Sequence, residues 1–335
     1  MTRRSRIPRF PAFKRLERGD REEVERLTAV VPPYSDFNFV SLWCWDTDDV
    51  CEISRLNDNL VVKLKDYATD EVFLSFLGLN AVPETATALL AFARQQGIEP
   101  SLRLVPAEVI EANRDLRRHV SVVEDPGSFD YVLSIEEWVG LHGGKFRNKR
   151  NAIHGFERKH APEFRLIDVH SRQIQREMVQ VFLLWSEKKK RFGLGETRNE
   201  LLAMRRAFSV DRVCDLTCFG VYEQDVMRGF SINQMLGDGY AMGHFWKADH
   251  SLSGIYAYML HNSCRYFADR QLRFFNIEQD LGKSGLAFSK HLYRPAHLFR
   301  KYAISPLSEV AATEQEDGAR TRRRTGSRRP PAPEK

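Results

Sequence analysis

The sequence predicts an α/β protein with two domains, each built around a mixed β-sheet. The chain has 335 residues, which is long enough for two domains of ordinary size. Short apolar segments bounded by turn residues alternate with segments whose apolar residues recur at helical spacing. A similar order of such elements occurs in both halves of the chain, with the weaker signals in the first half.

The first half opens with a helix near 18–27, in which Asp20 stands at the capping position and Glu23 follows three residues later. Pro32 and Pro33 end this helix, and an aromatic-rich stretch follows at 34–45. A second helix near 84–96 ends at Gly97. The predicted strands lie near 50–56, 60–65, 71–77, 102–105, 120–123 and 130–133.

The second half begins with a helix at 136–141 and a basic helix that ends near residue 159. Further helices are predicted around a stripe of apolar residues from Ile174 to Trp185, and near 200–208, 255–268 and 284–292. Strands are predicted near 164–169, 214–222, 227–236, 240–246 and 273–277, with a tight hairpin turn at 237–239. This order matches a GNAT domain, the acyl-CoA N-acyltransferase-like fold, in which a mixed sheet splays and opens a central cleft.

The sequence therefore predicts tandem GNAT-like domains at 13–134 and 135–307. The ends at 1–12 and 308–335 are expected to be disordered basic arms. The first fifteen residues carry a net charge of +6, and so do the last eighteen, which leaves the rest of the chain at −6. Such arms suit nucleic acid or an anionic membrane surface, and the alternative is that they only aid solubility.

The chain shows no signal of secretion or of metal binding. It lacks an apolar run of 18 residues and a signal peptide, so a cytoplasmic protein is expected. Five cysteines make a disulfide framework improbable, and Cys214 and Cys218 lack partners at zinc-site spacing. The motifs of P-loop proteins, serine hydrolases and zinc proteases are missing as well. We expect no metal and no bound cofactor.

A basic segment at 145–159 is the first candidate for binding. Six cations fall in fifteen residues, with Glu157 as the single acid, and Gly143 and Gly144 precede them. Free backbone N–H groups and cationic side chains at the start of a helix favour phosphate groups. The alternative is an ordinary solvated helix face.

An acidic segment at 275–286 is the second candidate. An apolar strand ends in polar residues, and a turn with Gly282 leads into the next helix. Ligands of such sheets bind near the carboxyl ends of strands. Glu278 and Asp280 can act as acid and base or hold an ammonium group. The alternative is that Asp280 or Ser284 only caps the helix.

The third candidate stretch, 244–256, joins a strand to a helix and contains Lys247, which we regard as a further substrate-binding residue. Acyl-CoA-dependent GNAT enzymes carry a glycine-rich loop for pyrophosphate at this junction. Only Gly254 stands in the turn here, which argues against coenzyme A.

Several of these segments together resemble a known family. Pro-Pro-Tyr-Ser-Asp-Phe-Asn-Phe at 32–39, Gly-Lys-Phe-Arg-Asn-Lys-Arg-Asn at 144–151 and Asn-Ile-Glu-Gln-Asp-Leu-Gly at 276–282 are similar to its signature elements, and Lys290 fits the last of them. The family is that of the stand-alone, soluble relatives of the phosphatidylglycerol lysyltransferase C-terminal domain. The resemblance extends over about 13–307.

The resemblance implies an aminoacyltransferase that uses aminoacyl-tRNA as co-substrate and transfers the aminoacyl group to a lipid such as phosphatidylglycerol or to another acceptor. Lys149 and Arg150 would face phosphates, with Lys145 beside them. Glu278 or Asp280 would bind the aminoacyl ammonium or act as base. The residues that would orient carbonyl, ribose or other substrate groups are Asn151, Asn276 and Lys290.

Two alternatives remain from the sequence. One is an N-acyltransferase that depends on acetyl-CoA, and the other is a binding protein without catalytic activity. If the protein is an aminoacyltransferase, it could remain cytoplasmic and also bind the surface of a membrane peripherally through anionic lipid.

Overall fold

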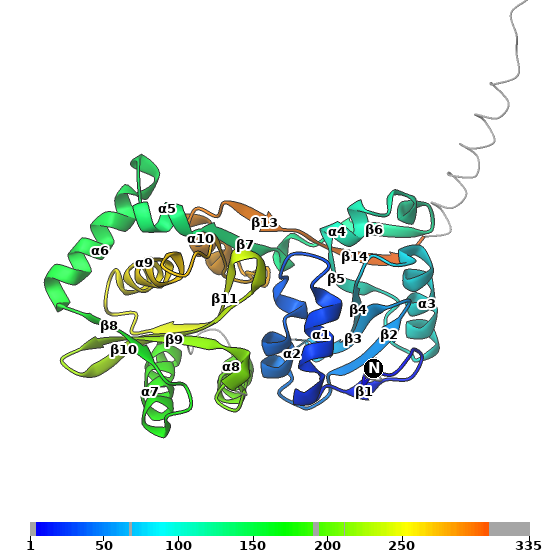
Figure 1. Cartoon of the computed structure of the whole chain (residues 1–335), viewed down its shortest axis with the longest axis horizontal. Helices are drawn as coiled ribbons and strands as arrows, with labels where there is room; N and C mark the ends of the chain where they lie inside the picture. Colours follow the sequence, from blue (N-terminus) through cyan, green and yellow to red (C-terminus); the bar gives the residue numbers. More distant parts are fainter. Residues whose placement is uncertain (1–4, 67–68, 190–193, 211, 308–335) are drawn as a thin grey trace, which may run out of the picture.

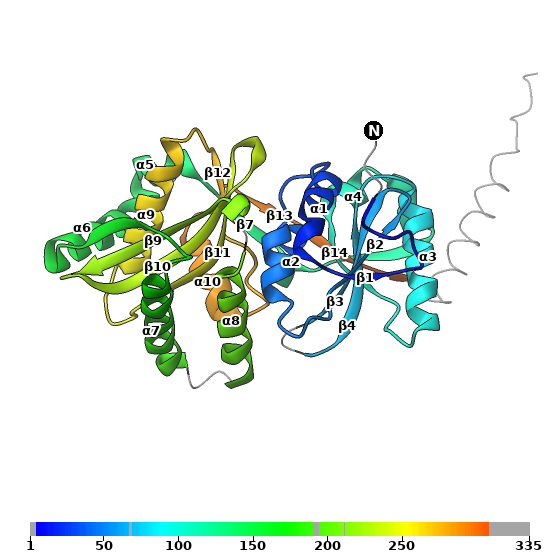
Figure 2. The same cartoon turned by 60° about the horizontal axis from the view of Figure 1, so that its bottom comes forward.

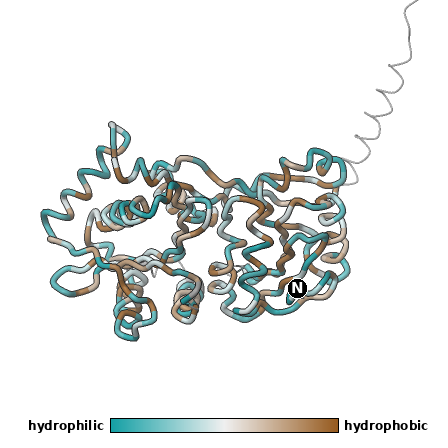
Figure 3. Tube along the Cα trace, viewed as in Figure 1, coloured by the Kyte–Doolittle hydropathy of each residue, from teal (hydrophilic) through white to brown (hydrophobic). Residues whose placement is uncertain are grey.

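The computed structural model describes residues 5–66, 69–189, 194–210 and 212–307, which form two seven-stranded mixed sheets with packed helices (Figure 1). We call the part around the first sheet the first half and the part around the second sheet the second half. The two halves lie side by side along the longest axis of the molecule, as a second view confirms (Figure 2). Brown, hydrophobic segments mark strands inside both halves (Figure 3).

The strands follow the predicted ones closely in most places. In spatial order, those of the first sheet are β1 (Lys14–Arg15), β2 (Glu52–Leu56), β3 (Asn59–Lys65), β4 (Val72–Leu77), β5 (Leu102–Pro106), β14 (Lys301–Pro306) and β6 (Val120–Glu124). Those of the second sheet are β8 (Glu163–Ile167), β9 (Leu216–Glu223), β10 (Val226–Met235), β11 (Tyr240–Ala248), β12 (Phe274–Asn276), β7 (Asp130–Ser134) and β13 (His297–Phe299).

The helices cover the sheets and fill the space between them. Those that belong to the first half are α1 (Arg21–Thr28), α2 (Phe39–Trp45), α3 (Val82–Gln95) and α4 (Ala107–Glu111). Those that belong to the second half are α5 (Ile135–Gly140), α6 (Arg147–His160), α7 (Arg172–Lys189), α8 (Leu194–Ala207), α9 (Ile255–Ala268) and α10 (Ser284–Leu292). The aromatic-rich stretch, which carried no predicted element, contains α2.

The two sheets have the same pattern of strand directions. In the spatial order given above, the first four strands of each sheet are antiparallel to their neighbours. The fourth and fifth strands are parallel, and the fifth, sixth and seventh strands are again antiparallel. The parallel pair is β4 and β5 in the first sheet and β11 and β12 in the second. Each half therefore repeats one architecture, as the recurring order of elements in the sequence predicts.

The halves exchange one strand each. The chain leaves the first sheet after β6, and its next strand, β7, fills the sixth place of the second sheet. It leaves the second sheet after β13, and β14 fills the sixth place of the first sheet. The two connections are 125–129 and the single residue Arg300. Figure 1 shows β13 and β14 passing from one half to the other.

This exchange corrects the predicted domain limits. Strand β7, assigned to the domain 13–134, lies in the second sheet, and β14, assigned to the domain 135–307, lies in the first. The predicted disordered arm is wrong for residues 5–12. Ile7 is buried, and Arg9 bridges to Arg55 of β2. The predicted arm 308–335 lies outside the described residues.

The hydrophobic core is continuous between the halves. One cluster joins residues of α2, such as Val40 and Leu42, to residues of α7, α8 and β10, such as Phe182, Met204 and Phe230. Helix α2 packs directly against α8. Among the described residues, no helix combines the length and the hydrophobicity needed to cross a bilayer.

Candidate active site between the two halves

Helix α2 brings polar side chains of the first half against the interior strands β10 and β11 of the second sheet. Asn38 precedes the helix and caps it, since its Oδ1 accepts a hydrogen bond of 3.1 Å from the N–H of Ser41. The Nδ2 group of Asn38 donates to Gln234 of β10 at 2.9 Å. The start of α2 is therefore fixed against the second half, with Ser41 in its first turn.

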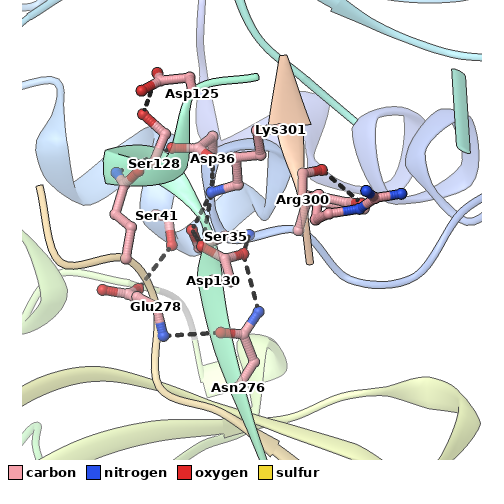
Figure 4. A network of polar contacts seen from close by, with 12 residues as sticks. Ser35, Asp36, Ser41, Asp125, Ser128, Asp130, Asn276, Glu278, Arg300 and Lys301 are labelled. Carbon is pink, nitrogen blue, oxygen red and sulfur yellow. Dashed lines mark hydrogen bonds and ion pairs between the residues drawn. The ribbon is translucent and has the colours of Figure 1, made fainter. Parts of the chain in front are cut away.

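A buried ion cluster lies where the exchanged strands pass each other. Lys301 opens β14 and Asp130 opens β7, both side chains have 0% exposure, and Nζ lies 2.7 Å from Oδ1 of Asp130. Lys301 also pairs with Asp36. The N–H and hydroxyl of Ser35 donate to Asp130 at 2.8 and 2.7 Å (Figure 4). Residues from three separate segments thus hold one ammonium group away from water.

Two carboxylates in this cluster share one ammonium group. Burial raises the pKa of Asp36 to about 6, although the charge of Lys301 opposes that shift. Asn276 of β12 completes the surroundings, because its Nδ2 donates to Asp130 and to the carbonyl of Pro33. The predicted substrate-binding residue Asn276 is therefore engaged inside the protein, where it ties the second sheet to the first half.

The candidate active site lies at the place where β11 and β12 separate. The last paired residues of these parallel strands are Met242 and Asn276. Two residues further on, His244 and Glu278 face each other, with 3.4 Å between Nδ1 of His244 and Oε1 of Glu278. Ser41 of the first half approaches both, since its Oγ lies 3.3 Å from Nδ1 and 3.5 Å from Oε1. Figure 4 shows Glu278, Ser41 and the ion cluster as neighbours.

The backbone that carries Glu278 is held by Lys290 of α10. Its Nζ donates to the carbonyls of Ile277, Glu278 and Gln279, the last two at 2.9 and 2.7 Å. Burial lowers the pKa of Lys290 to about 8. Glu278 itself has a left-handed backbone with φ of 59°, which is uncommon for a residue with a side chain. Lys290, which the sequence predicts to bind substrate, shapes this turn through these hydrogen bonds.

The second predicted acid has a different environment. Asp280 is buried, its Oδ2 accepts a hydrogen bond of 2.6 Å from Tyr131, and its Oδ1 accepts one of 2.8 Å from the N–H of Gly282. Both oxygens are therefore engaged in holding the turn. Glu278 remains partly exposed at 19%, so the two predicted acids differ in both contacts and exposure.

The basic segment 145–159 spans most of α6 and the turn before it. Arg150 donates to the carbonyls of Leu141 and Gly143, and Lys145 pairs with Glu137 at 2.5 Å. Lys149 lies 4.4 Å above the ring of Tyr293. Burial lowers the pKa of Lys149, and the positive charge of Arg294 adds to this effect.

The basic segment and the turn of Glu278 are connected through α10. Lys290 contacts the turn, and Tyr293, which follows the last residue of that helix, lies under Lys149. Two other predicted residues lie apart from these contacts. Asn151 is exposed on α6, and Lys247 pairs with Glu200 of α8 at 2.6 Å and lies over Trp185 of α7.

Sequence reasoning missed the partners of Glu278. Ser41 lies in an aromatic-rich stretch, and His244 lies in the stretch 244–256, where only Lys247 and the glycine pattern pointed to a function. The ion cluster was missed too, because Asp130 and Lys301 lie in short strands with few other signals. A polar residue within a strongly apolar segment was the available clue to each of them.

Comparisons with known proteins agree on one relationship. The family model described as "Phosphatidylglycerol lysyltransferase, C-terminal" matches residues 28–305. A conserved protein of unknown function from Bacteroides thetaiotaomicron superposes with a TM-score of 0.76 at 22% identity, covering 88% of this chain and 99% of that one. No curated protein sequence matches significantly.

Two further solved structures share the fold. The C-terminal domain of a putative lysylphosphatidylglycerol synthetase from Agrobacterium fabrum has a TM-score of 0.59 at 13% identity, covering 90% of this chain and 97% of that one. The structure of L-PGS from Bacillus licheniformis has a TM-score of 0.58 at 15% identity, covering 85% and 91%. At such low identity these likenesses establish the architecture, and they agree with the predicted GNAT-like fold.

Proposed function

Since the chain belongs to the family of the phosphatidylglycerol lysyltransferase C-terminal domain, we propose that it is an aminoacyltransferase that takes its aminoacyl group from aminoacyl-tRNA. The acceptor in this proposal is a lipid such as phosphatidylglycerol. Charged tRNA is a cytoplasmic substrate, so the reaction would take place on the cytoplasmic side.

One observation carries this proposal. A carboxylate, an imidazole and a hydroxyl converge at the separation of β11 and β12, and α10 connects this place to a cationic helix. An aminoacyl ester is already activated, so its transfer requires two things of the protein. It must hold the reactants together and move one proton. The convergent groups can move the proton, and the cationic helix can hold phosphates.

The cationic start of α6 is the proposed contact for the tRNA end. Lys149 and Arg294 lie close enough for their charges to act on each other, and a phosphate between them would relieve that repulsion. Arg147 is exposed on the same turn of α6. Arg150 is less suited to this role, because it holds the carbonyls of Leu141 and Gly143.

We expect the double substitution Arg147→Glu and Lys149→Glu to weaken binding of a mixture of charged tRNAs at least tenfold. Each lost phosphate contact should also reduce the slope of log affinity against log salt by about one. Fluorescence anisotropy over a range of salt concentrations measures both quantities. Arg118→Glu, a charge reversal at an exposed cation of the first half, is the matched control. Equal affinity of the double variant and this control would refute the assignment.

The surroundings of α9 support a co-substrate other than coenzyme A. Gly254 precedes α9 at the junction where related folds bind pyrophosphate, and its backbone has φ of 95°. A Cβ at this position would lie 2.4 Å from the carbonyl oxygen of Ala152 in α6. Helix α6 therefore packs against the turn that a pyrophosphate would need to reach.

Helix α10 supports an acceptor that is presented at a membrane. Four large apolar side chains in and before this helix are exposed, with Phe288 at 66%: Leu281, Leu286, Phe288 and Leu292. No acidic residue occurs between 281 and 307, whereas Lys283 and Arg294 flank the helix. Apolar side chains beside cations are typical of surfaces that bind anionic lipid. Lys290 on the same helix holds the turn of Glu278, so such a surface would place lipid close to the candidate active site.

We expect the double substitution Phe288→Ser and Leu292→Ser to reduce binding to vesicles of phosphatidylglycerol and phosphatidylcholine about tenfold or more, because two apolar anchors are lost. Cosedimentation measures the bound fraction. The control is the double substitution Val123→Ser and Leu166→Ser, at apolar residues that are 60% and 61% exposed elsewhere. Equal losses in the two variants, or equal binding of wild type to vesicles of phosphatidylcholine alone, would contradict this surface.

A further inference from the structure

The imidazole of His244 has one nitrogen with partners and one without. The side chain is 2% exposed, and its Nδ1 faces Ser41 and Glu278 at 3.3 and 3.4 Å. Its Nε2 is also buried and has no hydrogen-bond partner among the described residues. A buried nitrogen of this kind loses its contact with water without gaining another. It would therefore gain a hydrogen bond if a substrate hydroxyl were brought beside it.

The neighbours of Nδ1 determine which nitrogen carries the proton. The Ser41 hydroxyl can donate to Oε1 of Glu278. A hydrogen on Nδ1 would then point at oxygen atoms that accept it, whereas a lone pair on Nδ1 would face the Glu278 carboxylate and be repelled. The hydrogen-bond network thus assigns the proton to Nδ1. The lone pair of Nε2 is left available as a base.

We propose that His244 is the catalytic base of the transfer and that Glu278 and Ser41 are its positioning residues. This inference rests on the proposed function and names the proton acceptor within it. The acceptor hydroxyl loses its proton to Nε2 as its oxygen forms a bond to the ester carbonyl carbon. The bond from that carbon to the 3′ oxygen of the tRNA ribose then breaks. Nε2 returns the proton to this oxygen, so the imidazole ends the cycle neutral.

The matching place in the first half lacks these groups, which indicates that the chemistry belongs to the second half. Strands β4 and β5 pair at Leu74 and Leu102 and then separate. Two residues further on are Phe76 and Leu104, the counterparts of His244 and Glu278. Leu104 has the same left-handed backbone as Glu278, with φ of 62°. The architecture of the separated strands is thus repeated, but hydrocarbon side chains occupy the first copy.

The tautomer of His244 tests the positioning without any substrate. Two-bond nitrogen–proton spectra of the full chain, labelled with nitrogen-15 in histidine and recorded at about pH 8, where free imidazole is neutral, show which ring nitrogen bears hydrogen. The signals of His244 are assigned by their loss in His244→Gln. We expect hydrogen on Nδ1 in the wild type and a shift towards Nε2 in Glu278→Gln. Hydrogen on Nε2 in the wild type would overturn the proposal.

The rate of transfer tests the role of base. With charged tRNAs and a lipid extract that contains phosphatidylglycerol, His244→Gln should lower the rate by at least a hundredfold. Its affinity for charged tRNA should stay within about twofold of the wild type, and His297→Gln on β13 should leave both quantities unchanged. A His244→Gln variant that transfers at the wild-type rate would overturn the proposal. Absence of transfer by the wild type itself would instead count against the proposed function, and the tautomer would still decide the positioning of His244.

Discussion

We expect Lys301→Met to lower the free energy of unfolding by about 3–5 kcal/mol, the usual consequence of removing one partner from a buried ion pair. The methionine side chain can fill the space of the lysine. Asp130 and Asp36 would lose the ammonium group that they share, and Asp130, which is fully buried, cannot reach water without moving the exchanged strands apart. The decrease in the free energy of unfolding that follows from the missing ion pair should therefore exceed the effect of any change in packing.

Urea unfolding of the full chain measures this effect. Arg300→Met is the matched control, because Arg300 precedes Lys301 directly, is 46% exposed and, within the described part of the chain, forms ion pairs only with exposed Glu111 and Glu124. Its removal should change stability by less than about 1 kcal/mol. Combining Lys301→Met with Asp130→Asn should restore part of the loss, since one uncompensated charge is removed. Equal unfolding midpoints for Lys301→Met and Arg300→Met would show that the cluster does not stabilise the fold.

We expect Glu278→Gln to lower the rate of aminoacyl transfer by about 10²–10⁴-fold, the range typical of a lost acid/base contribution. The amide has nearly the shape of the carboxylate, so packing is preserved. Its NH₂ group, however, would donate to Nδ1 of His244 and draw the ring proton to Nε2. The ring would then offer the substrate a hydrogen where a lone pair is needed. Initial rates with charged tRNAs and lipid extract give the measurement.

Two comparisons separate this effect from general damage. Glu111→Gln, at an exposed carboxylate of the first half, should leave the rate unchanged. Glu278→Gln combined with His244→Gln should be no slower than His244→Gln alone, because residues that act as one unit are not additive. A double variant that shows the product of the two single losses would mean that Glu278 acts independently of His244.

Local patterns predict most of the fold. The hairpin at 237–239 and the apolar stripe from Ile174 to Trp185 depend on neighbouring residues only, and both lie where the structure has β10, β11 and α7. The exchange of β7 and β14 was not predicted, since nothing in either short segment identifies the sheet to which it belongs. Strand partners depend on contacts between distant segments, which periodicity does not record. Residues 297–299 carried no predicted strand for a simpler reason, because β13 has only three residues.

The sequence also predicts part of the candidate site. Glu278 and Asn276 stand out because polar residues end an apolar strand. Their neighbours do not stand out, because a buried serine or histidine inside an apolar segment resembles an ordinary core position. Asp280 was selected for its charge and Lys290 for its fit to the family motif, yet they hold the backbone at Gly282 and at 277–279. These sequence signals do not distinguish a residue that contacts substrate from a residue that only supports it.

The reciprocal placement of β7 and β14 restricts the movement of one half relative to the other. Two-lobed proteins often admit large ligands by bending at a hinge, but bending here would pull on two connections at once, and one of them is the single residue Arg300. A macromolecule the size of tRNA would therefore meet a preformed surface and insert only its end. The rearrangement needed for turnover is then confined to side chains and turns around the catalytic groups, and neither half cut from the other would retain a complete sheet.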